Sequence, residues 1–206
     1  ISGALAQGRY RIGSSPNWLG LGYFLANTEA TFNTSAALPV TPQPMRLAGV
    51  LAAITHDTRD NLFTPRSGNF VELSSATLDH SVGSDIDFTR LNLLGMQYLP
   101  FASNWYLGLR ESITHNIGDA PFYLQPFVYM RGVPAMRYQG ETVAQAEAEL
   151  RWQLWQRFSL VGFGGIGAAE DQIRSFSRQR EVSAGGIGMR YELARKEDIL
   201  ALELAT

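Results

Sequence analysis

Charged side chains alternate with apolar ones along the segment 145–154. The polar positions are Gln145, Glu147, Glu149, Arg151 and Gln153, and the apolar ones are Ala146, Ala148, Leu150, Trp152 and Leu154. A two-residue period is that of a β-strand with one polar and one apolar face. A soluble domain usually scatters its charges outward, whereas ionised groups gathered on one face suit a water-filled interior. The segment therefore predicts a strand that lines an aqueous interior.

Catalytic or metal-binding chemistry has little support in the sequence. The three histidines, His56, His80 and His115, stand at predicted strand ends or turns with no motif linking them. The chain has no cysteine, which excludes thiol catalysis, sulfur-bound zinc and disulfides. It also lacks a G-x-S-x-G, an H-E-x-x-H and a phosphate loop. We expect no enzyme, no cofactor and no metal site within these 206 residues.

The composition excludes one class of binding partner but does not identify the actual one. The 17 Lys and Arg against 19 Asp and Glu give no basic excess, so we set nucleic acid aside. No apolar run reaches the ~18 residues of a transmembrane helix, but a membrane strand needs only ~10 residues. The length suits one domain covering residues 1–206.

Alternating segments recur along the whole chain. They predict strands at residues 18–33, 45–56, 70–79, 87–100, 105–116, 143–154, 157–168, 181–193 and 198–206, after a short start near 8–12. The connection 117–142 is long enough to be either functional or disordered. About ten strands joined mostly by hairpins indicate an all-β, antiparallel, up-and-down meander that closes into a transmembrane barrel.

A soluble sandwich or a lipocalin-like barrel would also produce alternating strands. Two features favour the membrane. Several predicted strands are longer than the ~5 to 6 residues usual in soluble sheets, and aromatic residues gather near strand ends, as an interfacial girdle requires. The aromatic residues are Trp18, Tyr98, Phe101, Trp105, Trp152, Trp155, Phe158 and Tyr191.

The turn-rich segment 56–69, HDTRDNLFTPRSGN, carries the first family resemblance. It is similar to the D-[ST]-R-D-N...P-x-x-G hairpin of the outer-membrane surface-antigen superfamily, whose best-known members are the BamA and TamA assembly barrels. The matching residues are Asp57, Arg59, Asp60, Pro65 and Gly68. Carboxylate and guanidinium groups would fix the turn, and the glycine would supply permissive backbone. Ordinary turn chemistry explains the same residues equally well.

The segment 129–141, YMRGVPAMRYQGE, resembles the long-loop signature [VIL]-R-G-[FY] of that superfamily. Arg131 and Gly132 match, Val133 replaces the usual aromatic residue, and Pro134 follows. The resemblance implies that this loop folds into the barrel lumen and that its arginine pairs with acids on the wall, where Glu149 matches the wall glutamate. A solvated loop arginine is the simpler alternative.

The segment 160–167, LVGFGGIG, resembles the family motif F-x-D-x-G. Phe163 and Gly167 match, but Gly165 stands where the aspartate is expected. Three glutamates on predicted lumen faces, Glu147, Glu149 and Glu203, are the candidates to compensate for the missing acid.

The resemblance implies an outer-membrane barrel of a Gram-negative-type cell envelope that inserts outer-membrane proteins or translocates polypeptides. Its partners would be outer-membrane lipids, unfolded outer-membrane or secreted polypeptides, and periplasmic domains. The family's larger barrels have sixteen strands, so we expect this chain to be a fragment lacking the first strands and the last. Two alternatives remain: a passive plugged pore, or the membrane anchor or export barrel of a patatin-like lipase fusion. Nothing in the sequence indicates an oligomeric state.

Overall fold

The computed structural model describes residues 2–29, 44–155, 157–170 and 180–191, and these residues are almost entirely β-structure. Helical geometry within them is confined to two 3₁₀ turns, η1 (His80–Val82) and η2 (Phe122–Leu124). Neither described helical turn has the length or hydropathy of a membrane span. The strands are β1 (Ser2–Arg11), β2 (Asn17–Glu29), β3 (Pro44–Asp57), β4 (Gly68–Leu78), β5 (Phe88–Ala102), β6 (Trp105–Gly118), β7 (Thr142–Gln153), β8 (Phe158–Glu170) and β9 (Arg180–Tyr191).

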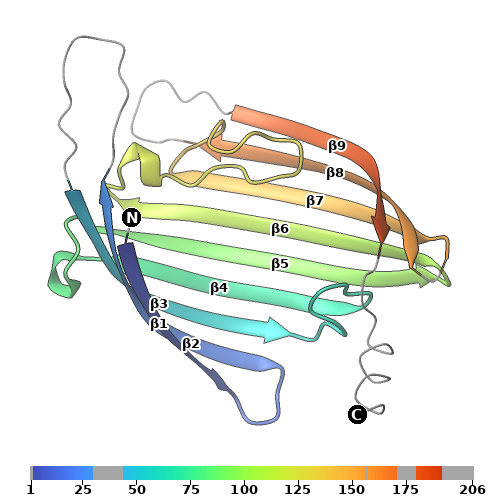
Figure 1. Cartoon of the computed structure of the whole chain (residues 1–206), viewed down its shortest axis with the longest axis horizontal. Helices are drawn as coiled ribbons and strands as arrows, with labels where there is room; N and C mark the ends of the chain where they lie inside the picture. The colour runs from blue at the N-terminus through green and yellow to red at the C-terminus, as the bar shows by residue number, and fades with distance from the viewer. Residues whose placement is uncertain (1, 30–43, 156, 171–179, 192–206) are drawn as a thin grey trace.

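The strands form one antiparallel sheet in which each pairs with its neighbour in the sequence, in the order β1 to β9. Figure 1 shows them side by side in chain order, with a twist that sets β1 to β3 steeply against β5 to β8. In the described ranges β1 and β9 each pair with a single strand. The predicted all-β, up-and-down antiparallel architecture is confirmed.

One detail of the strand prediction differs from the structure. The first strand begins at Ser2 rather than near residue 8, because Gly3, Ala4 and Ala6 carry too little side chain to show an alternating pattern. The nine strands of the described residues correspond to this first strand and the eight strands predicted after it up to residue 193. The predicted strand 198–206, with Glu203, lies outside them.

Connections of different kinds gather at opposite ends of the sheet. Residues 12–16, 58–67, 103–104 and 154–157 join strands at one end, which we call the short-turn end. Residues 79–87 and 119–141 join strands at the other, which we call the long-loop end. The connection 119–141 lies alongside β7 and β8 (Figure 1) and defines the inner face of the sheet.

Burial along β7 is the reverse of that in a soluble strand. From Gln145 to Gln153 the inner-face side chains are polar and buried or half-buried, with Arg151 only 3% exposed, whereas Leu150 and Trp152 on the outer face are 40% and 39% exposed. One cross-strand row on the outer face runs through Leu19, Ile54, Leu73, Leu93 and Ile113, all exposed. A contiguous apolar surface of this kind marks contact with a membrane or a partner rather than with water.

Aromatic residues border this apolar surface at the short-turn end. The rings of Trp105 and Trp152 stack at 5.2 Å, and those of Phe158 and Tyr191 lie 4.9 Å apart. Trp18 and Tyr98 do not belong to this border, contrary to the prediction. Trp18 pairs with inward-facing Thr55, and Tyr98 lines an interior cavity, because alternation turns both side chains inward.

Candidate functional site

The connection 119–141 packs against the inner face through its own apolar residues. Val128 and Met130 are buried together with Val143 and Ala169, and Val133 packs on this cluster. Glycine makes room for them on β8. A Cβ at Gly167 would lie 2.6 Å from Val128 Cγ1, closer than real contacts allow. The inner surface of β7 and β8 is therefore complementary in shape to the loop.

Polar side chains hold the loop backbone at two further places. The buried Gln145 accepts a hydrogen bond from the Tyr129 amide through Oε1 at 2.7 Å. Arg90 donates from Nε to Asn116 Oδ1 at 3.0 Å and from Nη2 to the Leu124 carbonyl. Leu124 packs on a second buried cluster that includes Leu47 and Phe88. These contacts satisfy loop backbone groups that burial would otherwise leave unpaired.

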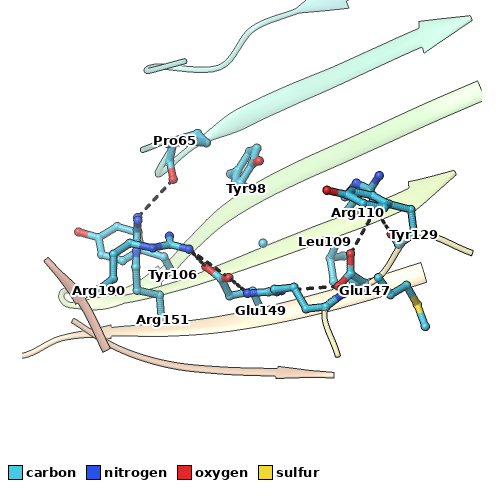
Figure 2. Close-up of a pocket in the computed structure, with 13 residues that line it drawn as sticks. Pro65, Tyr98, Tyr106, Leu109, Arg110, Tyr129, Glu147, Glu149, Arg151 and Arg190 are labelled. Carbon is cyan, nitrogen blue, oxygen red and sulfur yellow. Dashed lines mark hydrogen bonds and ion pairs between the residues drawn. The ribbon is translucent and has the colours of Figure 1, made fainter. Parts of the chain in front are cut away.

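Five alternating charges cross the inner face. Arg110 Nη1 lies 3.1 Å from Glu147 Oε2, and Glu147 Oε1 lies 3.6 Å from Arg131 Nε. Arg131 Nη1 lies 2.6 Å from Glu149 Oε2, and Glu149 Oε1 lies 3.0 Å from Arg190 Nη2. Figure 2 shows Glu147 beside Arg110 and Glu149 beside Arg190. These ion pairs connect β6, the loop, β7 and β9.

The signature residues of the loop lie next to the inner face of β7 and β8. Arg131 makes the contact with Glu149 and also lies 4.0 Å from the ring centroid of Phe163, a cation–π distance. Gly132 has φ 82°, a left-handed conformation that favours glycine. The Pro134 carbonyl accepts from the Arg137 amide in a turn. Arg131 is therefore bound to the wall rather than solvated alone.

The family motif has an aspartate at the position of Gly165, and here a glutamate of the neighbouring strand occupies the space beside it. Gly165 pairs directly with Glu147 across β7 and β8. A Cβ at Gly165 would lie 2.8 Å from Glu147 Cγ and 3.2 Å from Met130 Sδ. Glu147 accepts from the Arg131 amide through Oε1 at 3.4 Å. The carboxylate thus comes from β7, and β8 is glycine where that side chain and the loop need space.

The hairpin motif forms a compact turn between β3 and β4. Arg59 donates to both carboxylate oxygens of Asp57, at 2.9 and 2.8 Å, and this hydrogen bonding raises the pKa of Arg59. Asp60 Oδ1 accepts from the amides of Arg66 and Ser67. Gly68 has φ 98°, and a Cβ there would lie 2.2 Å from the Thr58 carbonyl oxygen. These residues fold the turn.

The same turn reaches the inner face of β7. Arg151 Nη2 donates to the Pro65 carbonyl at 3.2 Å, and Arg66 Nη2 donates to Gln153 Oε1 at 3.2 Å. Pro65, Tyr98 and Tyr106 join the charged residues around a cavity of about 480 Å³ (Figure 2). Segments more than eighty positions apart in the sequence therefore share one cavity.

The sequence interpretation missed several residues of this site. Arg90, Arg110, Gln145 and Arg190 hold the loop or its acidic partners, and none was singled out for that role. The parity of Arg110 and Arg190 within their strands was the available signal. The described residues hold no group of three or more His, Cys, Asp or Glu that could bind a metal.

Comparison with known proteins supports the fold. No family model matches the sequence, and no curated protein matches it. Solved structures do, and 51 chains resemble this one. One is BamA from Haemophilus ducreyi lacking POTRA domains 1-3, with a TM-score of 0.66 and 16% identity, covering 92% of this chain and 47% of that one. The chain thus has the antiparallel fold of a BamA-like barrel and spans about half of that neighbour's length.

Replacing Glu149 by glutamine is expected to loosen the loop. The amide keeps the shape of the side chain but removes the charge shared by Arg131 and Arg190. Limited proteolysis of the folded protein should cleave within 119–141 several-fold faster. Glu72→Gln is the matched control, because Glu72 is also an inner-face carboxylate but its partners are Thr55 and Arg9 on β3 and β1 rather than the loop. Unchanged cleavage in Glu149→Gln would show that Glu149 does not anchor the loop.

Proposed function

We propose that this chain is part of an outer-membrane β-barrel of the surface-antigen type and works in membrane-protein insertion or polypeptide translocation. The observation that carries the proposal is the inverted sheet, with exposed leucine, isoleucine and tryptophan outside and an ionic network inside. In hydrocarbon every backbone polar group must be paired within the protein, which a closed sheet achieves. The fold of the BamA structure supports the same assignment.

The docked loop favours a role in inserting or translocating polypeptides over a merely structural role. Because ion pairs such as that between Arg131 and Glu149 exchange with water, we infer that the loop also has a released arrangement, and a translocating or inserting barrel needs an interior that can change. The proposed partners are outer-membrane lipids on the outer face and unfolded outer-membrane or secreted polypeptides, delivered through periplasmic domains. We assign the chain no catalytic step.

A passive pore plugged by the same loop is the second candidate, and the packing of Val128 and Met130 against β8 favours it. The two candidates differ in what happens when the loop is released. A barrel that inserts or translocates polypeptides loses this activity when the loop no longer docks, whereas a plugged pore only gains conductance. Measuring both properties on one set of loop variants separates them.

The membrane placement is tested by tryptophan quenching. Trp152 lies on the outer face, 39% exposed and stacked on Trp105. In vesicles, lipids brominated along the acyl chain should quench its fluorescence more than water-soluble acrylamide does. A variant retaining Trp152 as its one tryptophan, with the other three replaced by phenylalanine, isolates the signal. Strong acrylamide quenching without bromine quenching would place the outer face in water and overturn the proposal.

A further inference from the structure

A shallow groove of about 650 Å³ lies on the outer face of β6 to β9, on the opposite side of the sheet from the docked loop. The outward-facing residues at the bottom of the groove, its floor, have short side chains, and Ile113 and Ile166 are exposed beside them. The small floor residues are Ala144, Ala146, Ala168 and Ser183. Short side chains on adjacent strands leave space for another backbone to approach closely.

A carboxylate stands in this groove among apolar neighbours. Glu111 lies in the middle of β6, pairs with Gly95 and Ala146, and is exposed on the outer face. Its Oε2 would be 3.8 Å from a Cβ added at Gly95, so the carboxylate lies over that glycine. In the part of the chain that the structure describes, no hydrogen bond or ion pair involves the Glu111 side chain. Glu181 adds a second carboxylate toward the long-loop end.

The distance of Glu111 from the aromatic border indicates how deep its carboxylate would lie in a bilayer. At ~3.3 Å per residue, Glu111 is roughly 20 Å along the strand from the aromatic border at Trp105. Strands of a membrane barrel tilt by ~45°, so this length corresponds to a depth of roughly 14 Å and places the carboxylate near the middle of the ~25 Å apolar band. Ionisable groups there are costly and mark functional contacts with a partner.

We propose that the groove docks a membrane-spanning segment of another protein that carries a lysine or arginine at mid-depth. This inference rests on the proposed membrane location. An acyl chain would fill the volume but leave Glu111 without a partner. A second copy, paired through the same face about a two-fold axis, would bring the carboxylates of Glu111 and Glu181 toward their counterparts. A basic side chain satisfies the charge, and the small floor residues admit its backbone.

The test uses the full chain in phosphatidylcholine vesicles and a synthetic helix of about 20 leucines and alanines with one central lysine. Energy transfer between labels on the chain and on the helix reports binding. The lysine helix should bind at least tenfold more tightly than the same helix with leucine at that position. Glu111→Gln should abolish this preference, whereas Glu72→Gln on the inner face should keep it. Ala146→Leu should weaken binding by filling the floor, and Ala52→Leu on the outer face of β3 should not.

The outcomes separate this inference from the proposed function. If Trp152 is quenched by brominated lipid but the two helices bind equally, the basic-partner inference is overturned while the membrane assignment stands. Lysine preference that survives in Glu111→Gln also overturns it. Equal binding that Ala146→Leu weakens would identify an apolar groove suited to lipid. A chain that does not enter bilayers overturns both proposals.

Discussion

Replacing Arg131 by alanine is expected to release the loop and open the interior. The substitution removes contacts with Glu147, Glu149 and Phe163 and leaves both carboxylates short of a cation. Hydrogen bonds to charged groups contribute ~1.5–3 kcal/mol, and the lower end applies because the Arg131 side chain is 42% exposed. About 1.5 kcal/mol corresponds to a roughly tenfold shift from docked to released loop. In planar bilayers the complete protein should show larger and more frequent openings.

Arg131→Lys and Arg137→Ala are the controls for this prediction. Lysine keeps the charge but loses the planar fork that contacts two carboxylates, so it should give an intermediate conductance. Arg137 lies on the same loop and stacks on Tyr138, and the ion pairs of Glu147 and Glu149 are with Arg110, Arg131 and Arg190, so its loss should leave conductance near that of the unsubstituted protein. A large, steady pore that Arg131→Ala does not change would contradict a loop held by this arginine.

Much of the fold follows from local alternation. In β7 the parity of Glu147, Glu149 and Arg151 predicted both the strand and its polar face, because side-chain direction in a strand depends only on position. The same rule would have turned Trp18 and Tyr98 inward, yet they were placed in the girdle by their nearness to strand ends. Ser2–Arg11 was mostly missed because glycine and alanine leave little alternation to detect.

The site was less predictable because it depends on contacts between distant segments. Arg131 and Glu149 were paired through a family resemblance, not through their spacing. The register of β7, β8 and β9 aligns Glu149 with Phe163 and Gly186, so its contact with Arg190 is a diagonal one that no local pattern encodes. The contact of the turn residue Pro65 with Arg151 joins segments far apart in the sequence and is not encoded locally either. Gly165 was interpreted as a loss, although its missing side chain makes room for Glu147 and Met130.

An exchange of Glu147 and Gly165 tests whether these two positions share one role. Gly165→Asp alone should destabilise loop docking by ~1–3 kcal/mol, because the new side chain overpacks Glu147 and Met130 and sets two carboxylates together. Glu147→Gly alone removes the partner of Arg110 and Arg131. In the double variant the carboxylate returns from the facing position. Loop protection from protease should therefore recover above that of either single variant.

The size of this recovery is the decisive quantity. Residues in direct contact typically show coupling energies of ~0.5–3 kcal/mol in a double-mutant cycle, whereas independent sites add. Gly188→Asp provides the matched control, because it is an inward-facing glycine of β9 whose Cβ would meet nothing within 4 Å. Combined with Glu147→Gly it should give additive effects. If the Glu147–Gly165 pair is also additive, the two positions are independent, and the loop arginine depends on Glu149 alone. A favourable coupling specific to that pair would show that the acidic partner of the loop is supplied by β7 in place of β8.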